Sequence, residues 1–171
     1  MKQTMLSNSE NNICSDSTLT ELIDNNKRIL ESKIKKETIE DFLDLLCNQE
    51  IHHKYVKLLR AITTCDGNAM IGNQKVISEL IFGDEKINNK LVFPLNLNGK
   101  EVSIQLKEEH GFVNLMEISK TQSTEELKRL YEYFLEFIHL LADLCLDRNY
   151  LAIDPISECY SLEIVIYCSI K

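Results

Sequence analysis

Residues that break helices are scarce in this chain, and their scarcity limits the folds open to it. Among 171 residues there are only 5 glycines and 2 prolines. Apolar residues instead recur every three or four positions, which is the spacing of one face of a helix. The longest such pattern covers about residues 124–148 and follows a capping box formed by Ser123 and Glu126. The sequence therefore predicts a mainly α-helical protein.

Shorter helices are predicted before this long one. They begin near Thr18, Thr38, His52 and Asn73, and the first is expected to run to about residue 34. Gly83 is expected to end the helix that Asn73 caps. Residues 1–16 are polar and rich in asparagine and serine, so we expect a disordered tail there and a single helical domain over residues 17–171.

One segment departs from the helical period. Asn98-Gly99 lies between two runs in which apolar and polar residues alternate, and this pattern predicts a β-hairpin over about residues 91–106. A two-residue turn pairs Leu95 with Val102, Phe93 with Ile104 and Leu91 with Leu106, all on one face. Pro94 restricts its strand to a sheet edge. Because an isolated hairpin is marginally stable, this face is expected to pack on helices.

Charge and composition argue against several classes of function. The formal net charge is −8, whereas sequence-independent binding to nucleic acid or anionic lipid needs a basic surface. No apolar run approaches the ~18 residues that cross a membrane, so we expect no membrane insertion by this segment. The six cysteines and four histidines form no metal-binding spacing, and the cysteines are expected to be buried and reduced. We therefore expect no metal site and no cofactor.

The stretch CLDRNYLAIDPIS, residues 145–157, is the strongest candidate for reactivity. A nucleophilic Cys145 needs a cation or a base beside it, and Arg148 stands three residues further along the chain. However, Cys145 is predicted on the apolar stripe of the long helix, where a buried neutral thiol is unreactive. The glycines of CDGNAMIGNQ, residues 65–74, are not followed by the Lys-Ser or Lys-Thr of a phosphate-binding loop, and the stretch is expected to follow a helix rather than a strand. We therefore expect no catalytic residue and no enzyme.

A structural interpretation of the same stretch is favoured. Asp147 and Arg148 are expected to hydrogen-bond backbone groups at the end of the long helix, and Pro155 to stop any further helix. Tyr150, Leu151 and Ile153 are expected to pack on the next helical layer. The stretch would then be a joint between two layers.

This stretch, together with the preceding LYEYFLEFIHLLAD, closely resembles a segment of inositol trisphosphate receptors, the intracellular calcium-release channels related to ryanodine receptors. The segments YVKLLRAITTCDGNAMIGNQKVISELIF and VFPLNLNGKEVSIQL resemble the same family and occur in its order, so the resemblance spans roughly residues 28–168. The family motif comprises Cys145, Leu146, Asp147, Arg148, Tyr150, Leu151, Ala152 and Ile153, and the loop motif comprises Cys65, Gly67, Asn73 and Gln74.

The resemblance implies an armadillo-like helical stack, of the RIH type, with one inserted hairpin. It implies a regulatory, coupling segment that transmits the change caused by ligand toward the calcium pore, without being pore or ligand site itself. Its partners would be neighbouring domains or subunits of a tetrameric channel on the cytosolic face of the endoplasmic reticulum, with inositol trisphosphate bound elsewhere in the receptor. The alternative is a free-standing helical adaptor derived from such a receptor, because the tail that starts with Met1 could be a true N-terminus.

Overall fold

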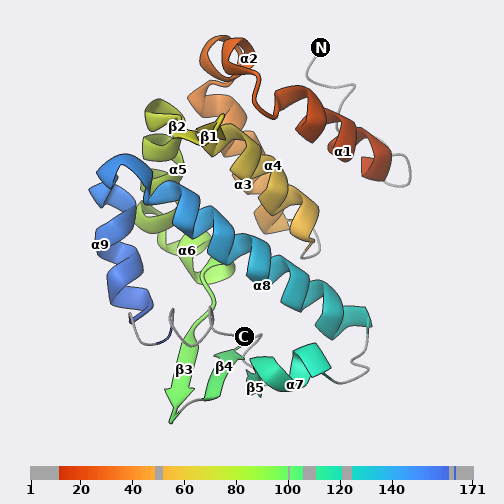
Figure 1. Ribbon diagram of the computed structural model, residues 1–171, viewed down its shortest axis with the longest axis vertical. Helices are drawn as coiled ribbons and strands as arrows, with labels where there is room; N and C mark the ends of the chain where they lie inside the picture. Colours follow the sequence, from red (N-terminus) through yellow and green to blue (C-terminus); the bar gives the residue numbers. More distant parts are fainter. Residues whose placement is uncertain are drawn as a thin grey trace.

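The computed structural model describes residues 12–48, 52–99, 101–105, 111–120, 125–161 and 164. This part of the chain is mainly α-helical and elongated (Figure 1). Helices α1 and α2 lie at one end of the long axis, and a small sheet lies with α7 at the other. The predicted fold class, mainly α with an inserted hairpin, is confirmed, and the succession of packed helices fits an armadillo-like stack.

The first predicted helix is two helices with different bounds. Helix α1 spans Asn12–Ile23, and α2 spans Lys27–Ser32. The break falls at Asn25, which has a φ of 55°, and the side chain of Asn26 then accepts a hydrogen bond from the Ile29 amide at 3.2 Å. Asparagine suits both positions because it tolerates left-handed backbone and caps helices. The disordered tail expected over residues 1–16 is wrong for residues 12–16, which belong to α1, and residues 1–11 lie outside the described residues.

The next elements build the loop motif. Helix α3 spans Lys36–Asn48 and α4 spans His53–Thr63. Strands β1, Thr64–Cys65, and β2, Asn68–Ala69, pair antiparallel across Asp66 and Gly67, whose φ values are 50° and 75°. Helix α5, Ile71–Gly83, starts earlier than predicted, so Asn73 is not its N-cap, although Gly83 is its last residue as expected. Asp84 caps α6, Glu85–Leu91, which the sequence analysis missed.

The hairpin is present with a different register. Strand β3, Leu95–Asn98, pairs with β4, Glu101–Gln105, and Leu95 faces Ile104 rather than Val102. The shift by two positions keeps the expected side chains on one face, because side chains alternate with a period of two. Asn98 belongs to the strand, and Gly99 follows it with a φ of 64°. Leu91 ends α6 instead of pairing in the sheet, and Leu106 lies outside the described residues.

The sheet also has a third strand. Strand β5, Phe112–Asn114, pairs with β4, which leaves β3 at an edge, as Pro94 predicted. Helix α7, Leu115–Lys120, follows and packs on β4. The end of the hairpin is tied to the C-terminal part of the chain, because the Tyr160 hydroxyl donates to the Phe93 carbonyl at 3.0 Å. The hairpin packs on α7 through β4, and the Phe93 ring that precedes β3 contacts the Tyr133 ring of α8, so the expected packing on helices is confirmed.

Helix α8, Glu125–Leu144, is the longest element and supplies much of the core. It packs along α4, and α5 and α9 flank the pair. Its buried face is rotated slightly from the predicted stripe, so that Tyr133 and Leu140 are buried while Ala142 is exposed. Ser123, its predicted cap, lies outside the described residues. The buried face comprises Leu130, Tyr133, Phe134, Phe137, Leu140, Leu141 and Leu144.

The prediction that Pro155 stops the chain's helical course is wrong. After a single 3-10 turn, η1, Leu146–Arg148, helix α9 spans Tyr150–Cys159 and contains Pro155. The missing N–H of Pro155 would have bonded the carbonyl of Leu151. Leu151 is exposed at the start of α9, where water can solvate that carbonyl. No helix in the described part of the chain has the length and apolar character needed to cross a membrane.

Candidate functional site at the junction of α4, α5 and α8

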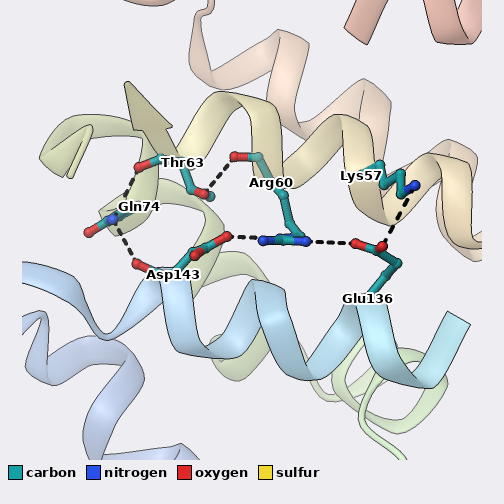
Figure 2. A network of polar contacts seen from close by, with 6 residues as sticks. All are labelled: Lys57, Arg60, Thr63, Gln74, Glu136 and Asp143. Carbon is teal, nitrogen blue, oxygen red and sulfur yellow. Dashed lines mark hydrogen bonds and ion pairs between the residues drawn. The ribbon is translucent and has the colours of Figure 1, made fainter. Parts of the chain in front are cut away.

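An arginine clamp joins α4 to α8. Arg60 donates from Nε to Oδ2 of Asp143 at 2.8 Å and from Nη1 to Oε2 of Glu136 at 2.7 Å (Figure 2). Lys57 approaches the other oxygen of Glu136, with 3.7 Å between Nζ and Oε1. Burial alone would lower the pKa of Arg60, but its hydrogen bonds to both carboxylates outweigh burial and raise that pKa. The Arg60 guanidinium therefore stays protonated throughout the pH range in which proteins are folded.

A buried glutamine extends this clamp to α5. The side chain of Gln74 is 1% exposed, and its Nε2 donates to the carbonyls of Thr63 at 3.1 Å and Asp143 at 2.9 Å. Thr63 in turn donates from its hydroxyl to the Arg60 carbonyl at 2.7 Å. Figure 2 shows that Asp143 is shared, with its carboxylate on Arg60 and its carbonyl on Gln74. The side chains of Arg60 and Gln74 thus join three helices, α4, α5 and α8.

Two further side chains carry the network to the joint after α8. Ser78 accepts a hydrogen bond at 3.0 Å from Nδ2 of Asn149, and its own hydroxyl donates to the Gln74 carbonyl at 2.8 Å. The same Asn149 nitrogen donates to the Leu144 carbonyl at 2.9 Å, which satisfies one of the open carbonyls at the end of α8. The start of α9 is therefore tied to both α5 and α8.

The structure brings the two sequence motifs together. Strand β2 of the loop motif packs against η1, and Gln74 reaches the last turn of α8 just before Cys145. Within the loop motif, Gly67 forms the turn, Cys65 is buried, and Nδ2 of Asn73 donates to the Ile62 carbonyl at 2.9 Å. Asn73 and Gln74 therefore fix the end of α4 rather than cap their own helix.

The family motif has a different arrangement from the one predicted. Asp147 and Arg148 have positive φ values, 52° and 60°, and both are exposed; Asn149 makes the hydrogen bonds that we expected from them. Tyr150 and Leu151 are exposed rather than packed against another layer. Leu146 is also exposed, Ile153 is half-buried, and Ala152 alone of the motif is fully buried.

The structure describes the thiols of Cys47, Cys65, Cys145 and Cys159, whereas the side chains of Cys14 and Cys168 lie outside the described part of the chain. Cys145 is half-buried rather than in the core, because the buried face of α8 is rotated away from it, and burial raises the pKa of its thiol. Cys47 and Cys65 are buried as expected, but Cys159 is exposed. In the described residues, no three histidine, cysteine, aspartate or glutamate side chains group so as to hold a metal ion.

The charged residues of the network were not predicted from the sequence, whereas Gln74 belongs to the loop motif. Arg60, Glu136 and Asp143 occupy polar positions on helices with strong apolar faces, so each reads as a solvated charge. One local signal was available, since Glu136 and Asp143 are seven residues apart and therefore lie on one face of α8. The partner of that face, on α4, could not be identified from spacing alone.

Comparison with known proteins identifies the family of the chain and a curated relative. A family model for the RIH domain matches residues 2–94, which include α4, the loop motif and α5. The inositol 1,4,5-trisphosphate receptor itr-1 of Caenorhabditis elegans is 25% identical to the chain over 165 residues, which cover 91% of this chain and 6% of the receptor. The chain thus spans a small fraction of the length of the curated relative that it matches.

Proposed function

This chain belongs to the RIH domain family, as a segment of inositol trisphosphate receptor type, and on that premise we propose that it couples ligand binding to calcium release. In this role the segment binds no inositol trisphosphate and forms no pore. It carries a displacement from neighbouring receptor domains on one side to those on the other, toward the pore.

The observation that carries the proposal is the polar network through which Gln74 and Arg60 join α4, α5 and α8. Gln74 contacts the end of α4 and the last turn of α8 from a fully buried position. Arg60 fixes the same turn of α8 through Asp143. Close-packed helices joined by satisfied polar groups move as one unit. A displacement of α4 is therefore passed on to α8 and α9.

The described polar groups of the segment are poorly suited to catalysis. The polar groups of the junction are engaged with one another across helix interfaces, and burial raises the pKa of the half-buried Cys145 thiol. We therefore propose a mechanical rather than a chemical role, on the cytosolic face of the endoplasmic reticulum, with neighbouring domains or subunits of a tetrameric receptor as partners.

A chimeric receptor tests the proposal. The segment of itr-1 that aligns with this chain is replaced by the chain, and calcium release from microsomes is measured as a function of inositol trisphosphate. We expect ligand-evoked release from the chimera. We also expect a Gln74→Ala chimera to release less calcium at saturating ligand while binding inositol trisphosphate with unchanged affinity, because the substitution loosens only the junction.

A Glu79→Ala chimera is the matched control, since Glu79 is an exposed residue of α5 outside the junction. It should behave as the unsubstituted chimera does. Equal calcium release from the Gln74→Ala and Glu79→Ala chimeras, at equal expression, would refute a coupling role for the junction. A change in ligand affinity in the Gln74→Ala chimera would place the segment in ligand binding instead.

A further inference from the structure

Four exposed apolar side chains gather at one groove beside the junction. Seven large apolar side chains are exposed in the described part of the chain, and four of them, Ile71, Leu146, Tyr150 and Leu151, line a single groove of about 370 Å³. Ile71 and Tyr150 are each 61% exposed and Leu151 is 41% exposed. A cluster of this kind marks an interaction surface, whereas single exposed apolar residues are ordinary.

The two walls of the groove, on α5 and α9, are spaced and shaped so that a helix can pack between them. On α5, Ile71, Gln74 and Lys75 line it at positions i, i+3 and i+4, which form one helical face. On α9, Leu151 and Asp154 line it three positions apart. Two helical ridges with an apolar trough between them are what a third helix packs into.

The charges at the groove limit the choice of occupant. Lys75 and Arg148 are balanced by Asp147 and Asp154, so the lining is neutral overall. The chain as a whole has a formal net charge of −8. Two copies docked face to face bring two strongly acidic bodies together, and nothing in the lining compensates for their repulsion. The balanced charges instead suit a segment that carries both signs beside an apolar stripe.

We propose that this groove receives an amphipathic helix from another region of the receptor, which buries an apolar stripe on Ile71, Leu146, Tyr150 and Leu151. The occupant carries apolar residues at i, i+3, i+4 and i+7, with basic and acidic residues at the edges. The proposal rests on the proposed function, and the length of the relative supports it, because this chain spans only 6% of that receptor.

The position of the groove gives the docked helix a route into the junction. Gln74 lines the groove and also donates to the carbonyl of Asp143, so the floor of the groove is part of the network between α5 and α8. Asn149 likewise lines the groove while it holds Ser78 and the Leu144 carbonyl. A helix that docks here contacts the residues that fix the start of α9. Its binding or release therefore changes how α9 is held against α5 and α8.

A displayed library of amphipathic helices tests the groove without need of the receptor. Eighteen-residue helices with a fixed apolar stripe and varied charged edges are selected against the full chain, and the affinities of the enriched helices are measured. Leu151→Glu on one wall and Ile71→Glu on the other should each weaken binding by at least about tenfold, because a charge replaces a buried apolar contact. Leu135→Glu is the matched control, since Leu135 is 40% exposed on α8 outside the groove.

Several results would overturn the proposal. These are the absence of any enriched helix, binding that both groove substitutions leave unchanged, or equal sensitivity to Leu135→Glu. Dimerisation of the chain, seen by sedimentation and abolished by Leu151→Glu, would assign the groove to a second copy. If the groove fails this test while the Gln74→Ala chimera still uncouples calcium release, the coupling function stands and only the helical partner is rejected.

Discussion

At the scale of single residues, Gln74 is the position on which most of the junction depends. Replacement with leucine keeps the volume of the side chain close to that of glutamine but removes a donor from the carbonyls of Thr63 and Asp143, of which the Thr63 carbonyl keeps the Met70 amide at 2.9 Å. We expect Gln74→Leu to lower the free energy of unfolding by about 1–3 kcal/mol, because the Asp143 carbonyl loses this donor and the Thr63 carbonyl loses one of two. Urea denaturation followed by circular dichroism measures this change. Lys75→Leu is the control and should shift stability by less than about 0.5 kcal/mol.

His52 makes the stability of the chain depend on pH. Its Nδ1 accepts a hydrogen bond at 3.2 Å from the Lys54 amide and thereby caps α4, which requires a neutral ring. Burial, together with the charges of His53, Lys54 and Arg129, lowers the pKa of His52 below 6.5, although Glu132 opposes this. The folded state therefore binds fewer protons than the unfolded state. The stability due to this neutral cap is complete above pH 6.5 and is lost as pH falls through the lowered pKa.

The substitution His52→Asn separates capping from titration. Asparagine caps a helix but does not titrate, so we expect stability at pH 7.5 to be nearly unchanged and the loss of stability between pH 7 and pH 5 to be smaller than in the unsubstituted chain. Thermal unfolding at a series of pH values measures the difference. An identical pH dependence in both proteins would show that His52 does not titrate in this way.

At the scale of elements, the sequence predicted those features that local chemistry decides. The break signals at Gly83 and Asn98-Gly99 and the apolar faces of α3, α4 and α8 were sufficient to place a hairpin among helices. The register of the hairpin was not predictable, because Asn98 can be either a turn residue or the last residue of a strand. The partners that Arg60 and Gln74 have on α8 were not predictable either, since they lie 69 to 83 residues away in sequence.

Helix α9 is the element in which tertiary structure overrides a local rule. Pro155 lies in its interior and removes a backbone hydrogen bond to the carbonyl of Leu151. We expect Pro155→Ala to raise the free energy of unfolding by about 1–2 kcal/mol, since the recovered bond and the better helix propensity exceed the loss of chain stiffness. Guanidinium denaturation tests this, with Glu158→Ala as an exposed control on the same helix. A lower stability would mean that proline stiffens α9 in the form that packs on α5 and α8.

At the scale of the whole molecule, α4 and α8 form the axis to which the other elements attach. Helices α1, α3 and α5 pack on α4, while α7 and α9 pack on α8. The cores of both ends are continuous through this pair, from Leu30 of α2 to Tyr160 after α9. This continuity supports the proposal that residues 17–171 are one domain. A domain of this kind should unfold cooperatively, so that segments far apart in sequence lose their structure together.

Native-state hydrogen exchange can test this proposal through the Arg60 clamp. Arg60→Ala leaves Glu136 and Asp143 without their shared partner, so we expect the free energy of unfolding to fall by about 1–3 kcal/mol. If the domain is one cooperative unit, the slowest amides of α3, α5 and α8 should lose protection by the same amount, although only α8 supplies the carboxylates. Lys57→Ala is the matched control, because its contact with Glu136 is longer and more exposed, and it should change protection by less than about 0.5 kcal/mol. Loss of protection confined to α8 would show that the two ends open separately, and a segment that opens in parts would transmit displacement poorly.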